Sequence, residues 1–448
     1  MTSRELVPQV ALNSLLDKYG VAGVSIAVIR PNRDPYSKSA SGTSHIVTQA
    51  AGLASRSPEI PMFDSTWLEI ASLSKTIAAA FMIQYFKGRG KDVTAPVNAL
   101  LREAGATFQM QAAEGMPAEW PEEVTLAQLV NHTGLGMHYV NGVPLSKEMP
   151  AVEQLISGTA EKPAPYGYAS LHMTKKPGTK FNYSGGGFLV LQHLLEVLEK
   201  RPIADIMASF LSASGTAVEL GLSFAQSLPC KHYAIGYRDN NAGAVEDGRL
   251  MFPPLAAGAL GTPAALAEWL RQLAVAYKDP NGCGPIAHDT AIQMLTPGPD
   301  LGSEAFMRAL MGLGVFVFEV ASNGVESNKW MLHQAANDGF RGLYLVCFDG
   351  PDATDGPRGL VVLSNGDNNA MFLNCAVVKL LLQSVDAFSP PLQGLDWSLT
   401  KSMDGGFTTA GLKQEEIVNL GIKDLVLNAF VKPSSNGSHE PPAKMAKM

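Results

Sequence analysis

Segments patterned as β-strands stand at the two ends of this chain, and segments patterned as helices lie between them. Short apolar runs of strand length occupy residues 24–30 near the start and residues 313–320, 342–348 and 359–365 near the end. A sheet that uses all of them must join the beginning of the chain to its end. The order therefore predicts one antiparallel sheet built from both chain ends, with a mainly helical lobe inserted between its halves.

Helical spacing of apolar residues completes this α/β (α+β) prediction. It occurs at residues 7–18 and 370–385, beside the strands, and at residues 73–87, 124–131, 187–199 and 263–277 between them. Residues 73–87 are apolar almost all round, which predicts a buried helix. The polar segment 31–57 is interpreted as a long functional or mobile loop.

These elements predict a single domain over residues 7–432, with a cleft between its two lobes as the place for a site. The sheet lobe would comprise about residues 7–70 and 300–395, and the helical lobe about residues 71–299. Residues 396–432 would form a C-terminal extension. Residues 433–448 are small and polar, which predicts a disordered tail.

Composition argues against several classes of function. The chain of 448 residues has a net charge of −7 and no basic block in its main body, which argues against nucleic-acid binding. The N-terminus lacks the apolar core of a signal peptide, and no run reaches the ~18 apolar residues of a membrane span, so we expect a cytoplasmic protein. Cys230, Cys283, Cys347 and Cys375 have no paired spacing, so neither a disulfide framework nor a metal site is expected.

Ser72 and Lys75 form the first candidate for chemistry. Two residues three apart on a helix share a face, so the lysine amine can reach the serine hydroxyl. Burial of Lys75 would favour its neutral form, which can accept the serine proton. The same spacing recurs at Ser398 and Lys401, but the residues that follow there cannot continue a buried helix. Context therefore selects Ser72, at a helix N-terminus that favours developing negative charge.

Tyr183 is the second candidate, because it precedes a run of three glycines at residues 185–187. A flexible glycine run can place a tyrosine at the mouth of a cleft. Near a lysine ammonium the pKa of the phenol would be lowered, and the phenol could then shuttle protons. The alternative is a half-buried tyrosine that caps a turn. A phosphate-binding loop is excluded, since no Gly-Lys-Ser/Thr follows the glycines.

The third candidate is His333, in a segment between two predicted strands. A histidine at a strand edge can donate a hydrogen bond to substrate or position a neighbouring group. The backbone N–H of Ala336 can complete an oxyanion hole with that of Ser72. The alternative is a histidine satisfied by local contacts at the end of a strand.

Taken together and in this order, the three elements resemble the class C β-lactamase family and its esterase and D-aminopeptidase relatives. That family carries Ser-x-x-Lys, then Tyr-x-Asn or Tyr-Ser-x, then Lys-Thr-Gly or His-x-Gly. The likeness extends over about residues 7–385. It is carried by residues 67–95, 124–136 (VTLAQLVNHTGLG), 177–199, 253–270 and 333–366.

The resemblance implies a β-lactamase/transpeptidase-like fold, a covalent acyl-enzyme, and neither a metal nor another cofactor. It carries the roles of nucleophile and proton-transfer partners onto Ser72, Lys75 and Tyr183. His333 falls where the family has Lys or His.

Three departures from the family pattern bear on the substrate. Gly185 replaces an amide-bearing Asn, His333-Gln334-Ala335 replaces Lys-Thr-Gly, and Ala335 adds a methyl group where backbone normally approaches substrate. These changes favour an ester or small amide over a β-lactam. Asn337 and Arg341 are further candidates for substrate binding, the latter as a charge for a substrate carboxylate.

Three hypotheses follow. The first is a serine hydrolase that cleaves an ester or amide of a small molecule, with His333 assisting Ser72, Lys75 and Tyr183. The second keeps the acyl-enzyme but transfers the acyl group to an alcohol or amine. The third is a catalytically silent scaffold of the same fold that serves in binding or self-assembly. Oligomeric state stays open.

Overall fold

The computed structural model describes residues 5–31, 45–136, 138–159, 161–227, 232–239, 243–282, 284–307, 309–322 and 326–384. The expected extension 396–432, the tail 433–448, the Ser398–Lys401 repeat, Cys230 and Cys283 lie outside these residues.

The main sheet joins the two ends of the chain, as the order of patterns predicts. It has eight strands in the order β3-β2-β1-β13-β12-β11-β10-β9, and all neighbouring pairs are antiparallel. Its strands are β1 (Gly23–Ile29), β2 (Ile46–Arg56), β3 (Glu59–Pro61), β9 (Leu310–Met311), β10 (Phe316–Ser322), β11 (Glu326–Asn337), β12 (Phe340–Asp349) and β13 (Arg358–Ser364). Val24 of β1 pairs with Ser364 of β13, which closes the sheet across the chain.

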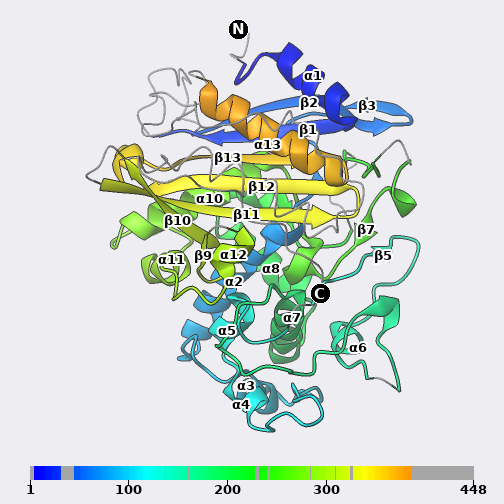
Figure 1. Ribbon diagram of the computed structural model, residues 1–448, viewed down its shortest axis with the longest axis vertical. Helices are drawn as coiled ribbons and strands as arrows, with labels where there is room; N and C mark the ends of the chain where they lie inside the picture. The colour runs from blue at the N-terminus through cyan, green and yellow to red at the C-terminus, as the bar shows by residue number, and fades with distance from the viewer. Residues whose placement is uncertain are drawn as a thin grey trace, which may run out of the picture.

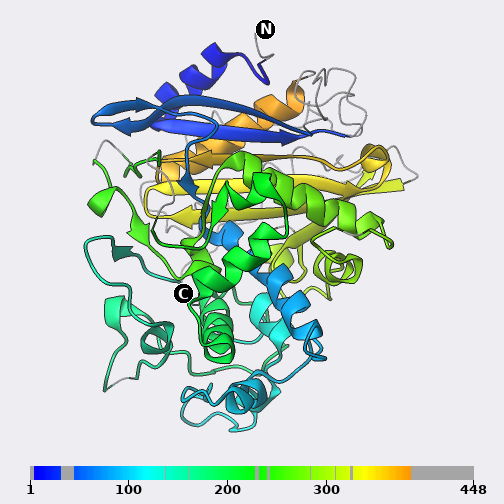
Figure 2. The same cartoon turned by 180° about the vertical axis from the view of Figure 1, so that it is seen from behind.

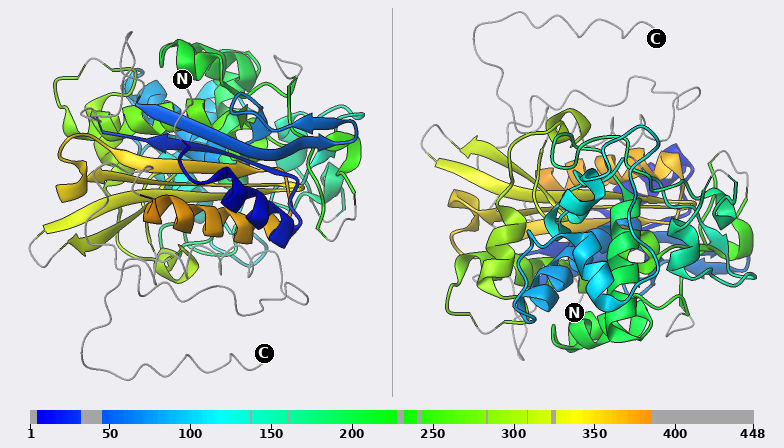
Figure 3. Two further views of the ribbon diagram at one scale, coloured as in Figure 1. Left: turned by 90° about the horizontal axis from the view of Figure 1, so that it is seen from above. Right: turned by 90° about the horizontal axis from the view of Figure 1, so that it is seen from below.

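Two helices cover one face of this sheet. They are α1 (Gln9–Tyr19) and α13 (Asn368–Gln383), which lie side by side (Figures 1 and 3). One apolar core fills the space between them and the sheet. The central strands β1 and β13 are buried at every position, which explains why their sequences are continuous apolar runs.

The mainly helical lobe lies on the other face and has a second apolar core. Its longest helix, α10 (Pro263–Lys278), packs across β1 and β13 (Figure 2). The other helices are α2 (Ser74–Lys87), α3 (Val97–Ala104), α4 (Trp120–Glu123), α5 (Leu126–Val130), α6 (Val152–Ile156), α7 (Gly185–Glu199), α8 (Ile203–Ser212), α9 (Thr216–Glu219), α11 (His288–Leu295) and α12 (Ser303–Met307). The described part of this lobe also contains five short strands, which are β4 (Leu68–Glu69), β5 (Val143–Pro144), β6 (Leu222–Ser223), β7 (Leu250–Met251) and β8 (Leu260–Gly261).

Two sequence interpretations need correction. The segment 31–57 is not one long loop, because residues 46–56 form β2 and pair along all of β1; residues 32–44 lie outside the described part. The glycines at 185–187 are not a flexible run either. They are buried and form the first turn of α7. The remaining predicted helices and strands are found near their expected positions.

One end of β11 is left open toward the helical lobe. The pairing of β10 with β11 begins at Phe316 and Leu332 and runs away from that end. Among the described strands, residues 333–337 therefore pair only with β12. The free edge of these five residues lies beside the start of α2 and leaves room there for a site.

Candidate active site

Ser72 lies at the start of the buried helix, as predicted. It belongs to a single 3₁₀ turn, Ala71–Leu73, that leads directly into α2. Ala71 has a positive φ of 45°, a conformation that strains a residue with a side chain. The Ser74 hydroxyl donates to the Ala71 carbonyl and accepts the Ala259 N–H, which holds the strained turn in place.

Lys75 is buried and lies against Ser72. Its Nζ donates to Ser72 Oγ at 3.0 Å and also to the Ala256 carbonyl. The aromatic rings of Tyr183 and Phe188 lie 5.1 and 5.5 Å from Nζ. Burial lowers the pKa of Lys75 to about 7. The sequence prediction of an amine that is readily neutral is therefore supported by the geometry around it.

Tyr183 lies just before α7 and faces the same space. Its phenol interacts with the Ser72 side chain. Its ring contacts His132, with centroids 4.3 Å apart, and stacks on Phe306 of α12 at 5.3 Å. Burial raises the pKa of Tyr183, and the interaction with Ser72 opposes this only in part. The expectation of a lowered phenol pKa is wrong, because loss of solvent outweighs the nearby lysine.

His333 lies on the open end of β11 with its ring 6.0 Å from that of Tyr183. Its Nδ1 is 2.6 Å from the Gln334 carbonyl oxygen, so Nδ1 carries the hydrogen. Burial and the nearby Lys75 lower the pKa of His333 to about 3, so the ring is neutral. Its Nε2 is therefore an acceptor, and it has no partner among the described residues.

Two histidines that sequence reasoning did not single out support Tyr183. His132 is buried, and its Nδ1 accepts the Ser184 N–H at 3.0 Å. Burial holds its pKa well below the ordinary value, with Lys75 and His333 adding to the effect. His138 contacts the Ser184 hydroxyl through Nδ1 at 3.1 Å. His132 lies in segment 124–136, which resembles the family but from which no functional residue is predicted.

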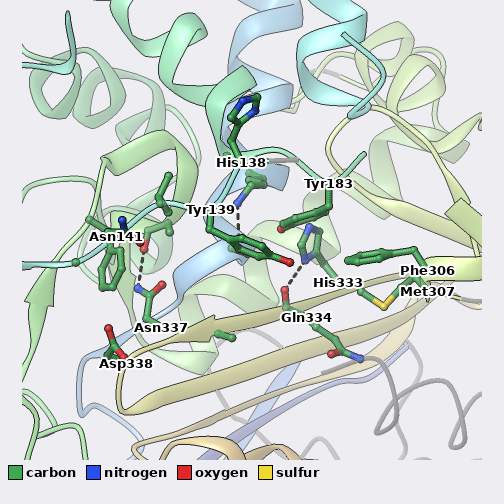
Figure 4. Close-up of a pocket in the computed structure, with 18 residues that line it drawn as sticks. His138, Tyr139, Asn141, Tyr183, Phe306, Met307, His333, Gln334, Asn337 and Asp338 are labelled. Atoms are coloured by element: carbon green, nitrogen blue, oxygen red, sulfur yellow. Dashed lines mark hydrogen bonds between the residues drawn. The ribbon is translucent and has the colours of Figure 1, made fainter. Parts of the chain in front are cut away.

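Most of these groups, but not His132, line one cavity of about 510 Å³ between the lobes (Figure 4). Ser72, Lys75, Tyr183, His333 and Ala336 all contribute to its wall. Figure 4 shows Tyr183, Phe306 and His333 converging on this space from three different elements. The other lining residues are His138, Tyr139, Val140, Asn141, Gly142, Gly185, Phe252, Ala257, Phe306, Met307, Gln334, Asn337 and Asp338.

The remaining candidates divide into two groups. Gly185 and Asn337 line the cavity, whereas Ala335 and Arg341 do not. Ala335 is buried in the core shared with the helical lobe. Arg341 is buried and donates to Asp367, to Asn368 and to the carbonyls of Asn337 and Phe340. A role for Arg341 in binding a substrate carboxylate has no support from this position.

The described residues contain no group of three or more His, Cys, Asp or Glu side chains placed to hold a metal ion. In the same part of the chain, no helix is both long and apolar enough to cross a membrane. Cys347 and Cys375, which both lie in apolar runs of the sequence, are fully buried.

Comparison with known proteins identifies relatives of this fold. A sequence profile of the family described as Beta-lactamase matches residues 11–382. An octameric penicillin-binding protein homologue from Pyrococcus abyssi superimposes with a TM-score of 0.57 at 17% identity, over 82% of this chain and 76% of that one. No sequence among curated proteins matches the chain.

Two further solved structures are similar over nearly their whole length. The class C beta lactamase from Rhodobacter sphaeroides has a TM-score of 0.56 at 16% identity, over 84% of this chain and 98% of that one. The D-amino acid amidase from Ochrobactrum anthropi SV3 has a TM-score of 0.54 at 18% identity, over 84% and 97%. At such identities these structures establish the fold alone.

Proposed function

The chain belongs to the beta-lactamase family, and from that premise we propose that it is a serine hydrolase that cleaves an ester or amide through an acyl-enzyme on Ser72. The observation that carries the proposal is the buried amine of Lys75, 3.0 Å from the Ser72 hydroxyl and with a pKa of about 7. A serine needs an adjacent base to become a nucleophile. Here the serine lies on the 3₁₀ turn that leads into α2, and the base follows three residues later in the first turn of that helix.

Acylation begins with neutral Lys75. One of its hydrogens stays on the Ala256 carbonyl, which directs the nitrogen lone pair toward Ser72. Ser72 Oγ forms a bond to the substrate carbonyl carbon while its proton moves to Lys75 Nζ, and the carbonyl electrons move onto oxygen. The positive charge that forms on Lys75 offsets the negative charge on that oxygen.

The N–H groups of Ser72 and Ala336 are our candidates for holding the oxyanion. In an antiparallel ladder, residues alternate between facing the partner strand and facing away. Asn337 and Phe340 flank a two-residue turn and pair across it, so Asn337 directs its backbone toward β12. The preceding residue, Ala336, then presents its N–H to the open edge, beside Ser72.

Tyr183 completes proton transfer to the leaving group. Its raised pKa keeps the phenol protonated, so it acts as a relay and not as a phenolate base. Collapse of the intermediate breaks the bond to the leaving group, which takes a proton through Tyr183 as Lys75 gives one up. Water then attacks the acyl group, Lys75 takes its proton, and Ser72 recovers a hydrogen as the acid departs.

The cavity favours a neutral acyl group. Tyr139, Val140, Phe252, Phe306 and Met307 supply apolar wall. Lys75 is the only lysine or arginine among the described residues that line the cavity. Its amine is hydrogen-bonded to Ser72 and to the Ala256 carbonyl. A side chain at Gly185 would place its Cβ 2.7 Å from the Val140 side chain, so Val140 already fills that place. An ester of an apolar acid fits these walls better than an anionic β-lactam.

The test is the intact mass of the protein after brief exposure to p-nitrophenyl acetate and p-nitrophenyl butyrate. We expect the wild type to gain one acyl group and Ser72→Ala to gain none. Ser209→Ala, which removes an exposed serine on α8, should behave as the wild type. Adding a primary alcohol separates hydrolysis from acyl transfer, because the product is then either the acid or a new ester.

Labelling of Ser72→Ala and wild type alike would place the reactive group elsewhere. Absence of label from both folded proteins, with every ester, would instead favour the silent scaffold.

A further inference from the structure

A single buried side-chain amide joins three elements of the site. Asn337, at the end of β11, donates from Nδ2 to Glu69 Oε2 at 2.6 Å. It also donates from Nδ2 to the Ala257 carbonyl at 3.0 Å (Figure 4). Asn337 and Glu69 are each 3% exposed. An amide nitrogen has two hydrogens, so these two bonds use its full capacity to donate.

Each of the three elements carries one part of the proposed machinery. Glu69 on β4 precedes the strained turn that holds Ser72. Ala257 follows Ala256, whose carbonyl accepts from Lys75. Asn337 follows Ala336, the second candidate for the oxyanion hole. The amide therefore ties the nucleophile, the base and the oxyanion donor to one another.

The backbone at this point is held as well. Arg341 donates to the Asn337 carbonyl, and Asp367 and Asn368 fix Arg341 in turn. Side chain and backbone together over-determine the position of the free end of β11. Such redundancy is typical of a shell that supports a preorganised site.

The other end of the same strand has a matching pair. Asn328 is buried, and its Nδ2 donates to Asp352 Oδ2 at 2.8 Å. Its Oδ1 accepts the Asp352 N–H at 2.9 Å. This pair ties β11 to a turn far from the cavity. Asn328 is thus a control with the same chemistry, burial and strand, but without contact to the site.

We propose that Asn337 and Glu69 are positioning residues that set the distance between the Ser72 turn and the Ala336 N–H. The inference rests on the proposed acyl-enzyme function. A donor at an oxyanion is worth about 10²–10³ in kcat, and this value depends on placement within a few tenths of an ångström. Loss of the tie lets β11 drift from Ser72, so transition-state stabilisation falls while binding of neutral substrate persists.

The experiment compares Asn337→Ala with Asn328→Ala in the full chain. Both substitutions remove a buried amide from β11, so similar losses of thermal stability are expected. Activity toward p-nitrophenyl acetate should separate them: kcat falls at least about tenfold in Asn337→Ala with little change in KM, and Asn328→Ala stays near the wild type. Affinity for phenylboronic acid, whose tetrahedral adduct on serine presents a charged oxygen, should fall by the same factor as kcat/KM.

Two variants of Glu69 test the same proposal if Asn337→Ala fails to fold. Glu69→Gln keeps an acceptor for Asn337, whereas Glu69→Ala removes it without altering β11. We expect Glu69→Ala to reproduce the loss of kcat and boronate affinity, and Glu69→Gln to recover most of both.

Equal effects of the 337 and 328 substitutions on kcat and boronate affinity would overturn the positioning role, as would full activity in Glu69→Ala. If the wild type forms no adduct with any ester or boronate, the proposed function itself fails. The two failures are therefore distinct.

Discussion

At the scale of single residues, Lys75 sets the expected pH dependence. Burial disfavours its charged form and lowers its pKa to about 7, and only the neutral amine can accept the Ser72 proton. We therefore expect kcat/KM to rise as pH increases through 7 and to level off in the mildly alkaline range. The measurement is a pH profile with p-nitrophenyl acetate. A flat profile from about pH 5 to 9, with chemistry rate-limiting, would contradict the role of Lys75 as base.

Tyr183 predicts a dependence on the leaving group. Tyr183→Phe keeps the ring contacts with His132 and Phe306 but removes the hydroxyl that relays a proton. An alkyl ester needs that proton, whereas p-nitrophenolate leaves without it. We expect kcat/KM to fall about 10²-fold or more for ethyl butyrate and much less for p-nitrophenyl butyrate. Equal losses for the two esters would assign Tyr183 a different task.

Glu69 predicts a dependence of stability on pH. Burial, with Asp338 adding and Asn337 and Arg249 opposing, raises its pKa from 4.5 to about 8. Between these values the folded protein keeps a proton that the unfolded chain releases, so the free energy of unfolding falls as pH rises from about 4.5 to 8. Glu69→Gln cannot titrate and should lose less stability over that range. Urea unfolding of both proteins at pH 5 and pH 8 checks this. Parallel changes would refute it.

Side-chain contacts between residues close in sequence can be predicted from the sequence, whereas those between distant residues cannot. Ser72 and Lys75 are three residues apart, in a 3₁₀ turn and the helix that it leads into, so their contact follows from local helical geometry. Arg341 looked available because its partner, Asp367, is 26 residues away and meets it only through the pairing of β12 with β13. The pKa of Tyr183 was predicted in the wrong direction because neighbouring charges are visible in a motif and loss of solvent is not.

At the scale of elements, close packing at the start of α7 should reverse the usual effect of replacing a helix glycine by alanine. Alanine normally stabilises a helix interior by about 1 kcal/mol relative to glycine. At Gly187, however, a Cβ would lie 2.5 Å from the Leu129 carbonyl oxygen of α5. We expect Gly187→Ala to destabilise the protein by about 1–2 kcal/mol, because α7 must move away from α5. Thermal unfolding measures it.

Gly88→Ala is the matched control. Gly88 ends α2 with φ −59°, and its Cβ would meet nothing closer than 3.4 Å. That substitution should be neutral or slightly stabilising. Equal effects at the two positions would show that α5 and α7 tolerate separation.

Elements were predicted best where one periodicity dominated. Strands β1, β12 and β13 are buried on both faces and read as apolar runs. The sequence pattern indicates a loop at β2 because most residues of this strand are only half-buried. Small and polar side chains such as Thr48, Gln49 and Ser55 therefore mask the strand pattern. The glycines at 185–187 are expected to be flexible from their local propensity, but close packing, including that of Gly187 against α5, holds them in the first turn of α7.

At the scale of the whole molecule, the site exists because both chain ends build one sheet. Strand β1 pairs with β13 across more than 300 residues, and the inserted lobe returns α2 and α7 to the open end of β11. The order of strand and helix patterns along the chain was enough to predict this arrangement. The open end of β11 was not predictable in the same way, because it depends on where β10 stops pairing.

The charge of the whole molecule and of its cavity should disfavour a substrate that carries a carboxylate. The chain carries a net charge of −7, and Asp338 at the cavity wall is ion-paired with Arg238, so this pair offers no free cation. Since burial lowers the pKa values of His138 and His333, neither ring supplies a cation at neutral pH. A substrate carboxylate is then disfavoured both during approach and when bound. We expect kcat/KM for the phenyl monoester of adipic acid, whose carboxylate is too far along the chain to attack its own ester readily, to be at least about tenfold below that for phenyl hexanoate, after division by their rates of alkaline hydrolysis.

Salt separates the two origins of that preference. Raising the ionic strength from about 0.01 M to 0.5 M shortens the screening length from roughly 30 Å to a few ångström. Repulsion of the anion by the whole molecule should then vanish, whereas the cost of placing a carboxylate in a cavity that lacks a free cation should remain. A preference that persists in part at high salt is the expected result. Equal or faster turnover of the anionic ester at both ionic strengths would mean that the cavity holds a carboxylate-binding group, and the proposal of a neutral acyl substrate would have to be abandoned.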